Sequence, residues 1–175
     1  MRDWPTLRTG EIPSPELVAA WIALGLAPTE RIPLWAAHWL VHGYDGPGLR
    51  TLAGLSGTDS HEVHDVVRDA LAECHTSIPE SVTAAAQTVF TQLARLHADG
   101  LVSEKWIVNE VDGILIRTGY PESLLDLPLG GVWYLIDEWG ESWGRTTHQL
   151  EAEVRKACAA QLAAGLSDQG AITGK

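Results

Sequence analysis

The chain has few cysteines and no long apolar run. Cys74 and Cys158 both fall on apolar faces of predicted helices, so we expect buried free thiols in a reducing compartment rather than a disulfide or metal pair. No apolar run approaches the length that a membrane span requires, and the first ten residues contain no apolar signal segment. We therefore expect a cytoplasmic protein that makes no membrane contact.

Basic residues are also scarce. Lys and Arg total 12 against 23 Asp and Glu, which gives a formal net charge of −11. Such a surface repels phosphates, so nucleic acid is excluded as an expected partner. The same charge attracts and steers a basic protein surface.

The signatures of familiar enzymes are missing. The sequence has no glycine-rich phosphate loop, no dinucleotide-binding fingerprint, no Gly-x-Ser-x-Gly nucleophile motif and no Cys-x-x-Cys pair. These absences favour a non-enzymatic protein without a cofactor, although distant residues can assemble a site that leaves no local motif.

What the sequence does contain is helical periodicity along most of its length. Apolar residues recur at i, i+3 and i+4, and the runs are separated by capping residues, prolines and glycines. Asp112-Gly113 is also a hairpin signal, but the apolar spacing around it fits a helix better. We predict an all-α fold, an irregular bundle of about seven or eight helices. One domain should cover residues 1–166, followed by a flexible tail over 167–175.

Capping residues predict where several helices begin and end. Ser14, Asp59 and Ser103 are candidate N-caps, and Pro33 can open a further helix. Two pairs have the spacing of capping boxes, and glycines mark helix ends. The pairs are Ser77 with Glu80 and Thr146 with Gln149; the glycines are Gly25, Gly43, Gly100 and Gly165.

The segment from Trp35 to His42 stacks two tryptophans and two histidines at i, i+4 spacing. His38 and His42 thus have a metal-ligand spacing, but no third ligand is defined, so we expect no metal. The segment is apolar on nearly every side, which is typical of a core helix. The alternative is a small enzyme of secondary metabolism, metal-dependent or not, with His38 or His42 as general acid or base. Its pocket would be lined by Trp35, Trp39 and Tyr44.

A second candidate is the acidic tryptophan cluster, which consists of Asp137, Glu138, Trp139, Glu141 and Trp143. In a helix, Trp139 and Trp143 would share one face, and Asp137 and Glu141 another. Carboxylates beside tryptophans suit a Lys or Arg from a partner, and tryptophan is frequent among binding hot spots. The alternative interpretation is that the tryptophans anchor the helix in the core while the acids are solvated.

Residues 34–74 resemble a group of small helical proteins of unknown function from actinobacteria. The resemblance is carried by Trp35-x-x-x-Trp39-Leu40, Leu49-x-x-Leu52-Ala53-Gly54-Leu55 and Glu62-Val63-x-Asp65-Val66-Val67-x-x-Ala70-Leu71. It implies no assigned activity, so no functional residue is transferred from it. Small acidic helical proteins are also common as immunity or antitoxin partners, which is an analogy of size and charge.

Together these features predict a non-enzymatic helical interaction protein of the immunity or accessory type. It would bind a basic protein partner through the acidic tryptophan cluster. An exposed apolar stripe could also be covered by a homodimer. The small enzyme with an aromatic and histidine-lined pocket is the competing hypothesis.

Overall fold

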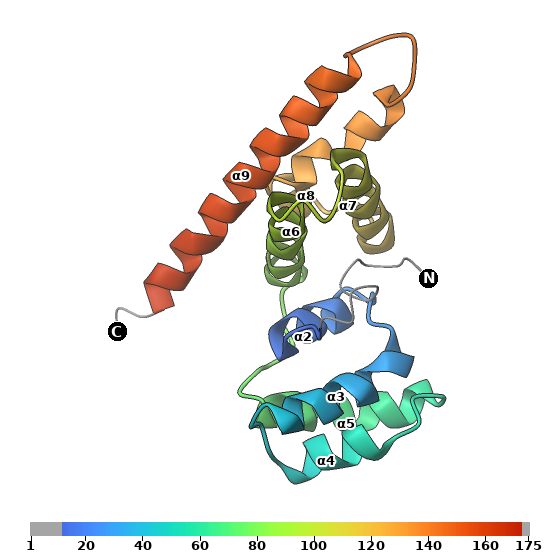
Figure 1. Ribbon diagram of the computed structural model, residues 1–175, viewed down its shortest axis with the longest axis vertical. Coiled ribbons are helices and arrows are strands. Elements are labelled where there is room, and N and C mark those ends of the chain that lie inside the picture. The colour runs from blue at the N-terminus through green and yellow to red at the C-terminus, as the bar shows by residue number, and fades with distance from the viewer. Residues whose placement is uncertain (1–11, 173–175) are drawn as a thin grey trace. The chain divides into compact units, whose positions relative to one another are not determined.

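The computed structural model describes the backbone of residues 12–172 and the side chains of residues 12–165. Helices are the regular secondary structure throughout this range, which contains no strand (Figure 1). Eight of the helices in this part of the chain have eight or more residues, which confirms the predicted all-α bundle. None of its helices combines the length and apolarity needed to cross a membrane.

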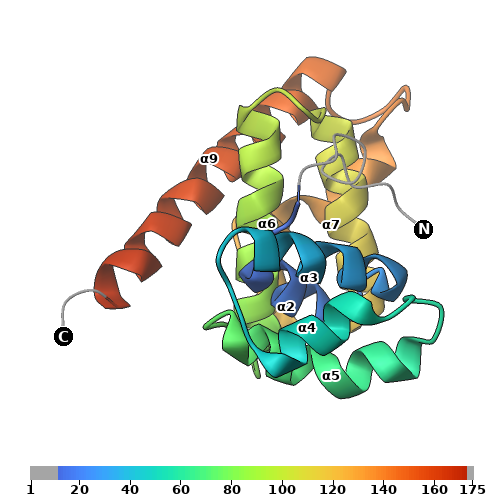
Figure 2. The same cartoon turned by 60° about the horizontal axis from the view of Figure 1, so that its bottom comes forward.

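The chain divides into two compact units, Met1–Ser81 and Val82–Lys175. The predicted single domain over residues 1–166 stays a prediction. The helices of the first unit are α2 (Pro15–Ala23), η1 (Thr29–Arg31), α3 (Ile32–Val41), α4 (Pro47–Gly54) and α5 (Ser60–Glu73). Within this unit, α4 packs against both α3 and α5 (Figure 2).

Two predicted N-caps of the first unit are confirmed. The side chain of Ser14 accepts a hydrogen bond from the N–H of Leu17 at 3.3 Å, and Asp59 accepts one from His61 at 2.8 Å. Each cap satisfies a backbone donor that has no partner inside its helix. Local sequence therefore determines where α2 and α5 begin.

Tryptophans form the centre of the first unit. The rings of Trp21 and Trp35 lie 5.7 Å apart, and both residues are 2 % exposed. Trp39 is also buried, and its indole N–H donates to the carbonyl oxygen of Pro13 at 3.0 Å. This bond satisfies the polar end of a side chain that otherwise contributes apolar area, as a buried indole requires.

A carboxylate from α5 closes the turn before α4. Glu73 accepts hydrogen bonds from the N–H groups of Gly48 at 3.0 Å and Leu49 at 2.7 Å. Unpaired N–H groups and the helix dipole favour an anion at this position. A Cβ on Gly46 would overlap the carboxyl group of Glu73, so glycine there lets the side chain reach the helix.

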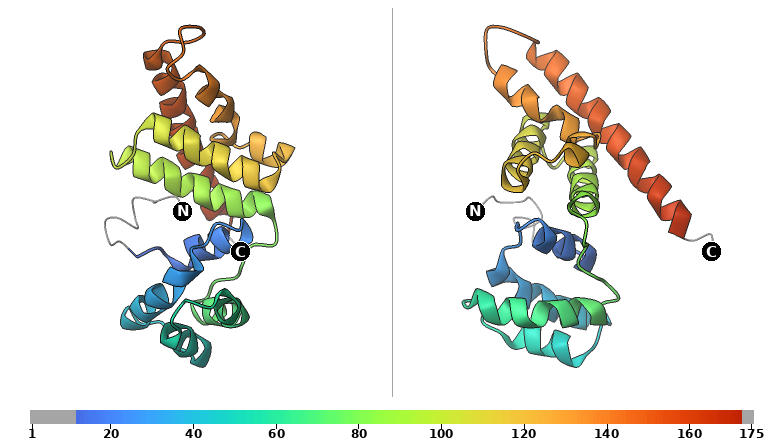
Figure 3. Two further views of the ribbon diagram at one scale, coloured as in Figure 1. Left: turned by 90° about the vertical axis from the view of Figure 1, so that its right-hand side faces the viewer. Right: turned by 180° about the vertical axis from the view of Figure 1, so that it is seen from behind.

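The second unit is built around α6 (Val82–Ala98), with α7 (Glu104–Thr118) and α9 (Thr147–Ile172) packed against it. Helices α6 and α7 lie side by side in Figure 3, and α9 runs past α6 in Figure 1. The connection from α7 to α9 contains α8 (Glu122–Leu125) and the 3-10 helix η2 (Gly130–Glu138). The Asp112-Gly113 pair lies inside α7, so the preference for a helix over a hairpin is confirmed.

Two predicted helix limits in this unit are wrong. Helix α6 begins at Val82, not at the Ser77 capping box, because Pro79 disfavours helical backbone at the residue before it. Helix α9 continues past Gly165 to Ile172 and so includes part of the predicted tail; residues 173–175 lie outside the described range. A Cβ on Gly165 would lie 3.2 Å from the side chain of Thr91, so this glycine permits close packing against α6.

A buried glutamine joins three segments of the second unit. Gln161 on α9 is fully buried, and its Nε2 donates to Gln87 Oε1 at 3.0 Å and Thr91 Oγ1 at 3.3 Å on α6. Its Oε1 accepts from the N–H of Leu129 at 3.3 Å. Because a buried amide is costly unless it is satisfied, this network specifies how α9, α6 and the start of η2 fit together.

A carboxylate also links the first half of α9 to α6 and α7. Glu104, the first residue of α7, lies 2.5 Å from Arg155 Nη1 and 3.4 Å from His97 Nε2. Partial burial acts to raise the pKa of Glu104, but hydrogen bonds from its backbone N–H, Arg155 and His97 outweigh burial and lower the pKa. The charged carboxylate therefore links α6, α7 and α9.

Both cysteines are buried free thiols, as predicted. Burial, together with nearby carboxylates, raises the pKa of Cys74 to about 11 and that of Cys158 to about 12. Because the thiolate is the reactive form, neither side chain is poised as a nucleophile.

Candidate functional site

The segment from Trp35 to His42 covers most of α3 and its C-cap, His42, but its predicted burial on all sides is wrong. Trp35 and Trp39 are buried, whereas His38 and His42 are exposed and Tyr44 is half-buried. Two apolar side chains of the same helix, Leu34 and Val41, are 59 % and 82 % exposed. Apolar residues on the solvent face concealed the amphipathic character of this helix in the sequence.

The histidines of α3 do not join the tryptophans in a common wall. His42 Nδ1 donates to the carbonyl oxygen of His38 at 2.8 Å, and both rings face solvent. Within the described residues, no group of three or more His, Cys, Asp or Glu side chains could hold a metal ion. The hypothesis of a small enzyme stays a prediction that no contact of α3 supports.

The acidic tryptophan cluster lies at the end of η2 and in the loop that follows. Helix η2 ends at Glu138, and Trp139 is its C-cap. The backbone then passes through Gly140 and Gly144, at φ values of 95° and 82°. Glycine adopts this left-handed conformation without the penalty of a Cβ, which ends the helix. The predicted helix through Trp143 is therefore wrong, and the expected shared helical faces do not form.

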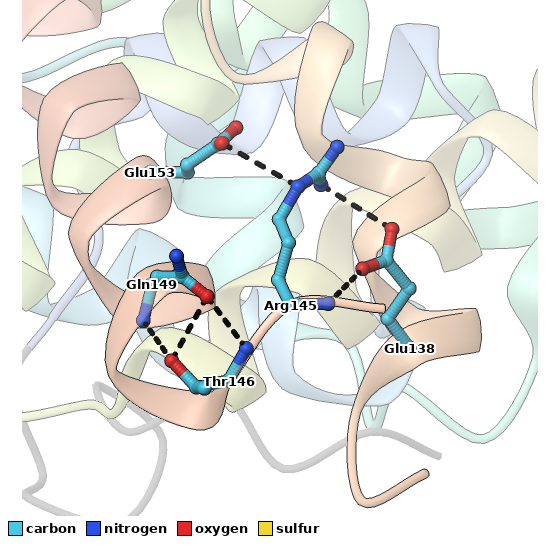
Figure 4. Close-up of polar contacts among 5 residues, drawn as sticks. All are labelled: Glu138, Arg145, Thr146, Gln149 and Glu153. Carbon is cyan, nitrogen blue, oxygen red and sulfur yellow. Dashed lines mark hydrogen bonds and ion pairs between the residues drawn. The ribbon is translucent and has the colours of Figure 1, made fainter. Parts of the chain in front are cut away.

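The loop is anchored by its own arginine (Figure 4). The backbone N–H of Arg145 donates to Glu138 Oε2 at 2.8 Å, and its guanidinium lies 3.4 Å from Glu138 Oε1 and 3.6 Å from Glu153 Oε1. The guanidinium also lies over the ring of Tyr134, 5.4 Å from the centroid. Glu138 thus serves the internal anchor of the loop rather than an outward surface.

Both ends of this loop are held in place. A Cβ on Gly144 would lie 2.5 Å from Glu138 Oε2, so the glycine lets the carboxylate approach the backbone of Arg145. At the far end, Thr146 N–H donates to Gln149 Oε1 at 2.8 Å, and Gln149 N–H donates to Thr146 Oγ1 at 3.3 Å (Figure 4). This reciprocal pair confirms the predicted capping box of α9.

Three members of the acidic tryptophan cluster face outward. Trp143 is 58 % exposed, and Asp137 and Glu141 are also exposed, whereas Trp139 is half-buried. In the part of the chain that the structure describes, no cation forms an ion pair with Asp137 or Glu141. We call Asp137, Glu141 and Trp143 the outward cluster.

A neighbouring aromatic group was not predicted. Tyr120 and Trp133 have ring centroids 5.1 Å apart, and those of Trp133 and Tyr134 are 6.4 Å apart. The hydroxyl of Tyr120 donates to Asp112 Oδ1 at 3.0 Å. Partial burial, the bond to Asp112 and the charges of Asp112 and Asp137 raise the pKa of Tyr120. Contact between α7 and η2 brings these residues together, and no local motif marks it.

No protein-family model, curated protein or solved structure matches this chain. The resemblance of residues 34–74 to actinobacterial helical proteins therefore stays a prediction.

Proposed function

We propose that this chain is a non-enzymatic interaction protein that binds a basic protein partner through the outward cluster. An immunity-type neutraliser or an accessory factor would use such a surface. The observation that carries the proposal is Trp143, a large aromatic side chain that is 58 % exposed and close in sequence to Asp137 and Glu141, two exposed carboxylates that form no ion pair among the described residues. An exposed tryptophan of this kind is a common anchor of binding interfaces.

The tryptophan and the carboxylates have different roles in this proposal. Burying a hot-spot tryptophan contributes about 2 kcal/mol or more to binding, whereas an exposed ion pair contributes about 0.2–1 kcal/mol. Trp143 would therefore supply most of the local affinity. Asp137 and Glu141, with the net charge of −11, would steer a cationic partner and make binding sensitive to salt.

The anchored loop supports the same function. Arg145, Glu138 and the Thr146 capping box hold the loop that carries Trp143. A loop that is ordered before binding loses less conformational entropy on binding than a flexible one. The internal ion pairs would thus serve affinity even though Glu138 does not face the partner.

The charge of the outward cluster is tested by the double variant Asp137→Asn/Glu141→Gln. Tagged full-length chain is used to capture partners from an extract of the source cells at about 50 mM and about 500 mM salt, which changes the screening length severalfold. The captured partner is identified, purified and titrated. We expect a basic protein that binds the variant about fivefold to tenfold more weakly at low salt, with a smaller difference at high salt.

The matched control is Glu122→Gln/Asp126→Asn, which removes two exposed carboxylates of the same unit near α8. This variant should bind within about twofold of the original chain, because only the overall charge changes. Recovery of no partner at either salt concentration would contradict the proposal. Equal weakening by both double variants, or capture of only a second copy of this chain, would do so too.

A further inference from the structure

We propose that the basic partner presents an arginine, and that this arginine binds the surface formed by Asp112, Tyr120, Trp133 and Asp137. We call this surface the Tyr120 site. The inference rests on the proposed function, because it names the chemical group by which the partner would be recognised. It also adds a contact with the partner that lies outside the loop carrying Trp143.

The internal arginine of the loop shows what this part of the molecule can bind. Arg145 lies over the ring of Tyr134 and pairs with carboxylates on both sides, Glu138 and Glu153. A guanidinium is weakly hydrated and flat, so it can contact a ring and pair with carboxylates at the same time. One aromatic ring and two nearby carboxylates thus accommodate an arginine that the chain itself supplies.

The Tyr120 site repeats this combination without an internal cation. Tyr120 is 37 % exposed, contacts the ring of Trp133 and donates its hydroxyl proton to Asp112. Asp137 lies on the same 3-10 helix as Trp133, and its charge is one of the causes that raise the pKa of the Tyr120 hydroxyl. Among the residues the structure describes, no Lys, Arg or His forms an ion pair with Asp112 or Asp137.

Asp112 keeps the capacity to bind a guanidinium. A carboxylate has about four acceptor positions, and the hydroxyl of Tyr120 occupies one of them. The hydrogen bond also holds the ring in place. Helix α7 ends at Thr118, directly before Gly119 and Tyr120, and the carboxyl end of a helix attracts positive charge. The carboxylates, the ring of Tyr120 and the carboxyl end of α7 thus all favour a cationic ligand.

We infer arginine rather than lysine because the Tyr120 site contains the aromatic rings of Tyr120 and Trp133. The ammonium group of lysine is compact and strongly hydrated, so it gains charge attraction but loses hydration when it contacts a ring. An exposed cation–π contact contributes a factor of about twofold to fivefold in affinity. A site built from carboxylates alone would not discriminate between the two side chains.

The test uses full-length chain labelled with ¹⁵N and three short peptides: acetyl-triarginine amide, acetyl-trilysine amide and acetyl-triglutamine amide. Indole N–H signals are followed by NMR, and that of Trp133 is assigned with the variant Trp133→Phe. We expect triarginine to shift the Trp133 signal saturably, with a Kd in the range of about 1 mM. Trilysine should bind about twofold to fivefold more weakly, and triglutamine should not bind.

Asp112→Asn provides the specific variant, because it keeps an acceptor for the Tyr120 hydroxyl and removes only the charge. We expect it to weaken triarginine binding about twofold to fivefold, while Glu122→Gln leaves binding unchanged. Equal binding of triarginine and trilysine would overturn the inference. So would an unchanged Kd for Asp112→Asn, or shifts at Trp143 without shifts at Trp133.

The two proposals fail in distinguishable ways. If the captured partner binds Asp112→Asn as tightly as the original chain but loses affinity for Asp137→Asn/Glu141→Gln, the Tyr120 site is wrong and the proposed function stands. If no basic partner is captured at either salt concentration, the proposed function fails whatever the peptides do.

Discussion

Replacing Gly130 with alanine is expected to destabilise the second unit by about 3 kcal/mol, the upper part of the usual range for overpacking a buried position. Gly130 is the first residue of η2, and an added Cβ would overlap the carbonyl oxygen of Leu124. Because that atom belongs to the backbone of α8, it cannot rotate away as a side chain would. The start of η2 must move instead, and η2 carries Trp133 and Tyr134.

The next residue offers a matched control for this substitution. A Cβ on Gly131 would meet only the carbonyl oxygen of Leu125, at 3.7 Å, which is an ordinary contact. Gly131→Ala should therefore change the free energy of unfolding by no more than about 0.5 kcal/mol. Urea denaturation, with amide hydrogen exchange to assign the change to residues 82–165, measures both variants. Equal stability of Gly130→Ala and the original chain would contradict this close packing.

Gln161→Leu is expected to cost about 2–3 kcal/mol, although leucine has a similar size and is more apolar. The substitution leaves the N–H of Leu129 buried without its acceptor, and an orphaned buried donor costs about 1–3 kcal/mol. The two bonds to α6 are lost as well, but Gln87 and Thr91 are half-buried and can turn to water. The apolar gain of leucine offsets only part of this loss.

Gln92→Leu is the control for Gln161→Leu. Gln92 lies half-buried on α6, so its replacement introduces the same chemical change without removing a buried network. It should leave the free energy of unfolding within about 0.5 kcal/mol of the original value. Denaturation curves in urea compare the two variants. A loss for Gln161→Leu no larger than that for Gln92→Leu would show that the network does not hold η2 to α9.

Local signals predicted much of the fold because caps and apolar periodicity act over a few residues. Ser14, Asp59 and Ser103 cap their helices through bonds to residues two or three positions away. Gly165 misled the prediction because its role is set by Thr91, a residue of another helix. A glycine that allows close packing and one that ends a helix look alike in a sequence.

The candidate site was only partly predictable for the same reason. The acidic tryptophan cluster was found by composition, and three of its five members face solvent. Glu138 binds the backbone of Arg145 because the loop between them turns back on itself. The loop can turn in this way because Gly140 and Gly144 adopt left-handed backbone conformations. The pairing of Tyr120 with Trp133 depends on packing between α7 and η2. Periodicity carries no information about either arrangement.

His38 and His42 illustrate the opposite error. Their spacing in the sequence suggested a ligand or catalytic site, but their contacts in the structure do not support one. His38 and His42 stand at a ligand spacing, but they face solvent and the nearest bond of His42 is to the backbone of its own helix. Apolar composition hid the exposed face, because Leu34 and Val41 lie on it. Burial must be known before such spacing can be interpreted.

The most direct test of the proposed function is the affinity of Trp143→Ala for the purified basic partner, measured by isothermal titration calorimetry. Since the side chain is 58 % exposed, the variant should keep its free energy of unfolding within about 0.5 kcal/mol. Binding should weaken about 30-fold, which corresponds to the loss of a hot-spot tryptophan of about 2 kcal/mol. An unchanged Kd with an intact fold would contradict the claim that this chain binds its partner through Trp143.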